Sequence, residues 1–272
     1  MKKLIVYLSP IEKAQNIVDY SIRLARHLQM NIHYVSNIDI EKLSKNKDDN
    51  VSKEELSNKL IEAKKIEIER VLEKDEWEWD EVNAVYSIYA GTLSEVFKST
   101  SLKERSKMVV LPLVDESKSN EKSVNQILKA TKLPVWCFRS EKEYRPVKTI
   151  VYGTDYKKAD INIIKSFSWL AKAFEAKVNL LHVYKKGKFK QQLIDAGLRD
   201  FIDKKIEYPA IDIHSKKKGS VVKGISSFCD KTFADLVILL KKDKYFFQDL
   251  IRKSTIERSL DKLDLPILIY KK

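Results

Sequence analysis

Basic side chains recur in four segments that follow three of the predicted strands in the second half of the chain. They fall within the segments 185–186, 216–218, 241–244 and 252–253. In a parallel sheet the carboxyl ends of the strands share one edge, so these segments would surround a single site. Lysines placed in this way hold an anion as point charges, without a glycine-lined loop. The pattern is also that of solvated loops in a lysine-rich protein, and the sequence leaves both interpretations open.

Other chemistry has no pattern to support it. The four histidines, at positions 27, 33, 182 and 214, are scattered, with no HExxH motif, so the sequence predicts no metal site. No serine stands in a G-x-S-x-G elbow, and no Walker loop occurs. Six glycines in the whole chain leave little material for a phosphate loop, which needs positive φ and close approach of the backbone. We therefore predict no catalytic residues.

The composition is that of a globular protein of about two domains. The chain has 272 residues, of which 43% are hydrophobic and 33% charged, and its apolar runs are too short to span a membrane. Cys137 and Cys229 lack CxxC spacing and no export signal is visible, so we expect a cytoplasmic chain. Residues 1–145 carry 25 basic and 24 acidic side chains and residues 146–272 carry 27 and 15, so the second half holds +12 of the net +13.

The two halves repeat one order of elements. Each half opens on an apolar strand and a long helix and closes on Leu-Pro followed by another apolar strand. The expected strands are 3–9, 31–35, 82–89, 108–111 and 135–138, then 148–154, 178–184, 210–214, 236–240 and 267–270. The expected helices are 11–28, 52–74, one from 92 and one ending near 130, then 157–175, 188–204, 220–231 and 255–263. The chain is therefore predicted to be a diverged tandem duplication.

Strands separated by helices of this length pair in parallel through right-handed crossovers. We predict an α/β chain of two open, five-stranded parallel sheets flanked by helices, with domains at 1–142 and 146–272. Exposed apolar edge strands are costly, so we expect the last strands of the two halves to pair as an internal pseudo-dimer, and a further homodimer is left open. Trp77 and Trp79 either cap a sheet edge or form a partner-binding hot spot.

Several segments of the second half resemble the universal stress protein family. They are the strand ending in Thr154-Asp155, the strand ending in His182-Val183, the run Gly219-Ser-Val-Val-Lys-Gly-Ile and the closing Leu265-Pro-Ile-Leu-Ile. The first half matches more faintly, for example at Gly91-Thr-Leu-Ser-Glu-Val-Phe. The resemblance covers nearly the whole chain as a tandem two-domain form. It implies the adenine nucleotide alpha hydrolase-like fold.

Family members that bind ATP carry the signature G-x2-G-x9-G-S/T after the fourth strand. With Ser254 on its final hydroxyl, the three glycines fall on Leu240, Asp243 and Lys253, so the glycine cradle is absent from the second half. In the first half Ser123 takes the place of the hydroxyl, and that half lacks the cradle too. The resemblance therefore implies a degenerate nucleotide-binding motif.

The adenine-side carboxylate of the family is matched by Asp155, which has a second interpretation as the cap of the following helix. We predict a stress-response regulatory or binding module without catalysis, without the usual ATP site and without a cofactor. The alternative is a universal stress protein that binds ATP or another adenine nucleotide. The candidate ligand-binding residues are Asp155, Val183, Lys241, Lys242, Lys253 and Ser254.

Partners other than a small anion or nucleotide have little support. Nothing in the sequence predicts a membrane partner. A nucleic-acid role rests only on the basic second half, which lacks both an aromatic RNA-binding face and a helix-turn-helix motif.

Overall fold

The structure is a computed structural model that describes residues 2–39, 52–74, 81–99, 104–114, 118–155, 158–184, 196–200, 202, 204, 206, 208, 210–241 and 255–271. The chain divides into two compact units, Met1–Tyr144 and Arg145–Lys272, where the sequence placed domain limits at 142 and 146. Within the described ranges, every helix is either too short or too polar to cross a membrane.

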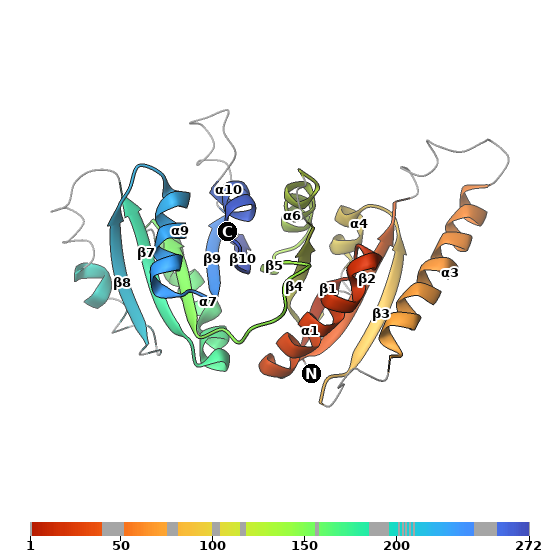
Figure 1. Cartoon of the computed structure of the whole chain (residues 1–272), viewed down its shortest axis with the longest axis horizontal. Coiled ribbons are helices and arrows are strands. Elements are labelled where there is room, and N and C mark those ends of the chain that lie inside the picture. The colour runs from red at the N-terminus through yellow and green to blue at the C-terminus, as the bar shows by residue number, and fades with distance from the viewer. Residues whose placement is uncertain are drawn as a thin grey trace. The chain divides into compact units, whose positions relative to one another are not determined.

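The first unit alternates strands and helices in the predicted order (Figure 1). Strand β2 runs to Ile38, beyond the end expected at residue 35. Trp77 and Trp79 lie outside the described residues, and their role stays a prediction. The elements are β1 (Lys3–Tyr7), the 3-10 helix η1 (Ile11–Lys13), α1 (Ala14–Leu28), β2 (Asn31–Ile38), α3 (Lys53–Leu72), β3 (Ala84–Ala90), α4 (Leu93–Lys98), β4 (Ser106–Leu113), α6 (Lys118–Ala130) and β5 (Val135–Arg139).

The second unit repeats this order. Most of the helix expected at 188–204 falls outside the described residues, although residues 196–200 are helical. The elements are β6 (Thr149–Thr154), α7 (Lys158–Phe174), β7 (Lys177–Tyr184), β8 (Ile211–Lys217), α9 (Val221–Thr232), β9 (Leu236–Lys241), α10 (Thr255–Lys262) and β10 (Ile267–Lys271).

Each unit contains five parallel strands in the same spatial order, which confirms the predicted fold class. The order is β3-β2-β1-β4-β5 in the first unit and β8-β7-β6-β9-β10 in the second. All the pairings described within the two units are parallel. The pairing of β5 with β10 as an internal pseudo-dimer stays a prediction.

Helix boundaries follow local capping chemistry. The Ser52 hydroxyl accepts the Glu55 backbone N–H at the start of α3, and Thr92 and Glu95 form a capping box at the start of α4. The first helix of each unit ends at a left-handed residue that is not glycine, Gln29 with φ 52° and Glu175 with φ 50°. In a chain with few glycines, these helices thus end at polar residues that adopt the left-handed conformation at a modest energetic cost.

Long-range aromatic contacts join α1 to β5 in the core of the first unit. Trp136 is fully buried and its Nε1 donates to the Tyr20 hydroxyl at 3.0 Å. The Tyr20 ring stacks on Phe138 with centroids 3.8 Å apart. Burial raises the pKa of Tyr20, so its hydroxyl stays neutral and serves as the acceptor. Truncating Trp136 would cost about 3–5 kcal/mol.

Candidate functional site

The carboxyl edge of the second unit brings three of the predicted site residues to one level. Gly153 pairs with Leu181 of β7 and with Leu239 of β9. Two residues further along each strand stand Asp155, Val183 and Lys241. The three residues therefore follow neighbouring strands at the same height, as the parallel topology requires. Lys242, Lys253 and Ser254 lie outside the described residues.

Val183 is held in place by a close approach between β7 and α9. A Cβ added to Gly224 would lie 2.7 Å from Val183 Cγ1 and 2.8 Å from Cγ2. Only glycine lets the helix come this near the strand. The Val183 side chain is thus occupied in packing.

One lysine of the predicted basic site also has a structural contact. Lys216 lies beside Val183 in the sheet register, and its Nζ donates to the Ser227 hydroxyl of α9 at 2.7 Å. The next two lysines, Lys217 and Lys218, are exposed. Of the three lysines at 216–218, the exposed pair is therefore the better placed to meet an anion in solution.

The first turn of α7, close to this edge, carries a second carboxylate that the sequence did not single out. The Tyr152 hydroxyl donates to Asp160 Oδ1 at 2.6 Å, and Asp160 is buried. Burial, together with the charges of Asp160 and Asp155, raises the pKa of Tyr152. The only sequence signal for Asp160 was an acidic residue in the first turn of α7. Two carboxylates near Tyr152 repel a phosphate from the end of β6. An anion would therefore bind closer to the exposed lysines, Lys217 and Lys218.

His182, at the end of β7, has a structural contact. Its Nδ1 lies 2.9 Å from the Thr154 carbonyl oxygen, which joins the ends of β6 and β7 and orients the backbone just before Asp155. None of the described His, Cys, Asp and Glu side chains gather in a group of three or more that could hold a metal ion.

At the corresponding edge of the first unit, side chains link the ends of three strands. The Tyr7 hydroxyl donates to Asn37 Oδ1 at 2.7 Å, and Asn37 Nδ2 donates to the Gly91 carbonyl at 2.7 Å. This chain of bonds links the ends of β1, β2 and β3. Burial is also the main reason that the pKa of Tyr7 is raised, so its hydroxyl remains a donor.

The main chain after β4, where family members place the phosphate loop, is bonded within the first unit. Asn120 of α6 accepts the Val114 backbone N–H at 3.1 Å through Oδ1, and its Nδ2 donates to the Val114 carbonyl. An amide that is already paired is not available to a phosphate. The sequence alone showed no signal for Asn120, because the contact depends on where α6 packs.

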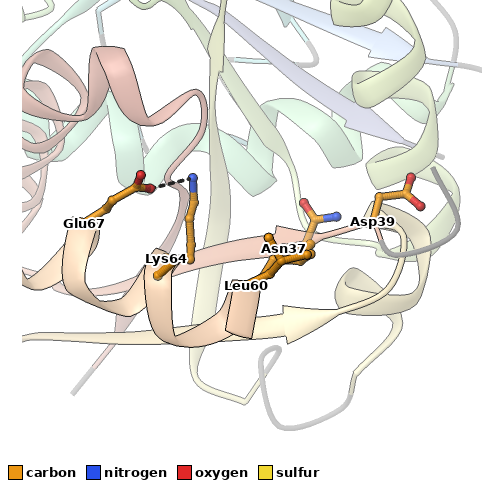
Figure 2. Close-up of a pocket in the computed structure, with 7 residues that line it drawn as sticks. Asn37, Asp39, Leu60, Lys64 and Glu67 are labelled. Carbon is orange, nitrogen blue, oxygen red and sulfur yellow. Dashed lines mark ion pairs between the residues drawn. The ribbon is translucent and has the colours of Figure 1, made fainter. Parts of the chain in front are cut away.

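A pocket of about 370 Å³ opens beside this edge, between the end of β2 and α3, and Asn37 is one of the residues that line it. Figure 2 shows Lys64 and Glu67 of α3 paired across 3.7 Å, with Asn37 and Asp39 opposite. Apolar Ile38, Leu60 and Ala63 complete the lining. None of the predicted site residues line it, and its charges are mixed.

Comparison with solved structures shows the same fold. A universal stress protein from Archaeoglobus fulgidus DSM 4304 has a TM-score of 0.68 at 15% identity, covering 99% of this chain and 98% of that one. A putative universal stress protein from Pseudomonas aeruginosa UCBPP-PA14 has a TM-score of 0.57 at 13% identity, covering 100% and 93%. The cytoplasmic domain of a prokaryotic cation chloride cotransporter has a TM-score of 0.55 at 10% identity, covering 98% and 94%.

The chain therefore has the fold of universal stress proteins in a tandem, two-unit form. Sequence comparison adds no assignment, since no family model and no curated protein matches the chain.

Proposed function

We propose that this protein is a universal stress protein-like regulatory or binding module that works without catalytic turnover and without the family's glycine-loop ATP site in either unit. The observation that carries the proposal is that polar groups at the carboxyl edge of the first unit are already hydrogen-bonded within that unit. There Asn120 occupies the Val114 peptide, and Asn37 joins Tyr7 to Gly91.

The second unit supports the same proposal through its residue types. The first glycine of the signature corresponds to Leu240, which lies in β9 and pairs with Tyr270 of β10. A leucine within a paired strand does not offer the open, flexible backbone that a phosphate needs. The occurrence of this fold in the cytoplasmic domain of a transporter is consistent with a regulatory use.

The alternative function is binding of an adenine nucleotide by the second unit alone. It is favoured by the common level of Asp155, Val183 and Lys241 across β7, β6 and β9. In this alternative Asp155 and the Val183 main chain hold the nucleoside, while Lys241, Lys242, Lys253 and Ser254 hold the phosphates.

A thermal-shift scan separates these functions. The ligands are ATP, AMP, cyclic nucleotides and polyphosphate, each at low and high salt. A ligand at a hundred times its dissociation constant stabilises the folded state by about 2.7 kcal/mol, which is a readily measured shift of roughly 5–10 °C. We expect no nucleotide to shift the melting temperature at high salt.

A salt-resistant shift with ATP that Asp155→Asn removes would refute the proposal and establish the alternative. A shift with polyphosphate that disappears at high salt would instead identify an electrostatic anion site. In that case Lys242→Glu and Lys253→Glu should abolish the shift. Lys231→Glu, an exposed lysine at the other end of α9, should leave it unchanged.

A further inference from the structure

The outer edge strand of the first unit, β3, lacks the features that normally prevent association through an exposed edge. Its sequence Ala-Val-Tyr-Ser-Ile-Tyr-Ala contains no charge and no proline, and none of its residues is buried. Natural edge strands are usually guarded by charges, prolines or bulges, because an open row of backbone groups pairs readily with another strand.

The second unit provides an internal comparison. Its outer edge strand, β8, occupies the same place in the sheet order. That strand carries Asp212, Lys216 and Lys217, and Asp212 pairs with Lys177 at 2.8 Å. Within one duplicated chain, one outer edge strand therefore carries charges and the other carries none in its own sequence. The charges beside β3 are the carboxylates of the neighbouring helix, Glu62, Glu69 and Glu73, which act on Tyr86.

Exposed apolar side chains flank β3. Val85 is 57% exposed and Ile66 of α3 is 64% exposed. The Tyr86 hydroxyl donates to Glu69 of α3, and Ile66 lies three residues before Glu69, on the same side of that helix. Apolar surface thus borders the edge both on the strand itself and on the helix packed beside it.

The backbone groups that β3 offers can be derived from its bonds to β2. Ile32 N–H donates to the Asn83 carbonyl, and Gly91 N–H donates to the Ile38 carbonyl. Odd-numbered residues of β3 therefore point their backbone groups toward β2. Since the direction alternates along a strand, Ala84, Tyr86, Ile88 and Ala90 point theirs away from β2, toward the side on which the described residues supply no further strand.

The strand is also close to a palindrome about Ser87. If two copies pair antiparallel with Ser87 at the centre, Tyr86 faces Ile88, Val85 faces Tyr89 and Ala84 faces Ala90. The outward-pointing residues then form the hydrogen-bonded pairs, and Ser87 forms a non-hydrogen-bonded pair with its own copy. Two of the cross-strand matches join an aromatic to a β-branched side chain, which is a stabilising combination.

The charge distribution favours association of two copies through the first half of the chain. Residues 1–145 carry 25 basic and 24 acidic side chains, a net charge of +1, while the remainder carries +12. Two copies that meet through the first unit keep their strongly basic halves out of the interface.

We propose that β3 is the docking strand for a second copy of this chain, which pairs with it antiparallel about a two-fold axis at Ser87. Pairing of this kind is isologous, so it closes at a dimer. It covers the exposed edge of both copies and the apolar side chains beside it.

A cysteine substitution tests the register of this dimer. In a non-hydrogen-bonded pair the Cα atoms lie about 4.5 Å apart, within the range of about 4.4–6.8 Å that a disulfide bridges. Ser87→Cys should therefore form a covalent dimer under mild oxidation. Lys217→Cys, at the end of the guarded strand β8, should not. The native thiols Cys137 and Cys229 are buried and do not compete.

Sedimentation equilibrium tests the association itself. We expect the wild-type chain to dimerise and Val85→Lys to raise the dimer dissociation constant at least about tenfold, because each copy then places a lysine at the paired edge. Ala90→Lys should act in the same way. Val221→Lys, which alters an exposed apolar residue of the second unit, is the matched control and should leave the constant unchanged. Circular dichroism and melting of each variant check that it is folded.

Two results would overturn the proposal. One is a wild-type chain that remains monomeric up to its solubility limit. The other is a dimer that survives both edge lysines while Ser87→Cys fails to cross-link, which would place the interface elsewhere on the chain.

Discussion

Gly224 in α9 is the position where the packing of the second unit can be tested most sharply. Replacing a helical glycine by alanine normally stabilises a protein by up to about 1 kcal/mol. At Gly224 the new Cβ would lie 2.7 Å and 2.8 Å from the two γ-methyl groups of Val183. Valine is stiff about χ1, and β7 is paired on both sides, so neither partner can move freely.

The expected magnitude comes from setting these two effects against each other. Overpacking of this kind costs about 1–3 kcal/mol, which offsets or exceeds the gain in helix propensity. The matched control is Gly197→Ala, since Gly197 lies in the helical segment 196–200 and an added Cβ there meets nothing within 4 Å. The difference between the two variants isolates the cost of packing, and we expect it to be about 1–3 kcal/mol.

Urea unfolding of both variants, with Val183→Ala and the double variant, completes the measurement. Removing the γ-methyl groups of Val183 should relieve the clash, so the double variant should be more stable than the sum of the single changes implies, by about 1 kcal/mol or more. If Gly224→Ala stabilises the protein as much as Gly197→Ala does, the inferred contact between α9 and β7 is wrong.

Two further predictions concern buried polar groups. The Ser259 hydroxyl is fully buried and has no hydrogen-bond partner among the described residues, so Ser259→Ala should raise the free energy of unfolding in urea by about 1 kcal/mol; a loss of stability would mean that the hydroxyl is bonded. Burial lowers the pKa of His214 from 6.5, so the unfolded chain binds its proton more readily. The contribution of His214 to the free energy of unfolding should be fully present above pH 6.5 and should decline as the pH falls through that value. His214→Asn should flatten this decline in melting experiments, and an unchanged pH profile would contradict the assignment.

Much of the fold was predictable because it depends on local patterns. Apolar runs of strand length alternate with amphipathic helices, and such an alternation permits little except parallel sheets with crossover helices. The Leu-Pro start of the closing strands in both halves marked the duplication. Helix starts at Ser52 and Thr92 follow from residue type alone, since their side chains cap the backbone within the same turn.

The candidate site was predictable only in part. The common level of Asp155, Val183 and Lys241 follows from strand ends in a parallel sheet. The structural use of Lys216, which bonds to Ser227, was not predictable, because the pattern of lysines is the same whether a side chain points to solvent or beneath a helix. The role of Gly224 likewise depends on the distance between α9 and β7.

By itself, the sequence determined the order of the elements and their repetition, because periodicity, capping and residue type act over a few neighbouring positions. Only the tertiary structure decided that Asn120 reaches the Val114 peptide, that Tyr152 meets Asp160 and that β3 points the backbone groups of its even-numbered residues away from β2, at the outer edge of the described sheet. These contacts depend on register and on the packing of helices against the sheet, where a shift of one residue moves every side chain to the other face.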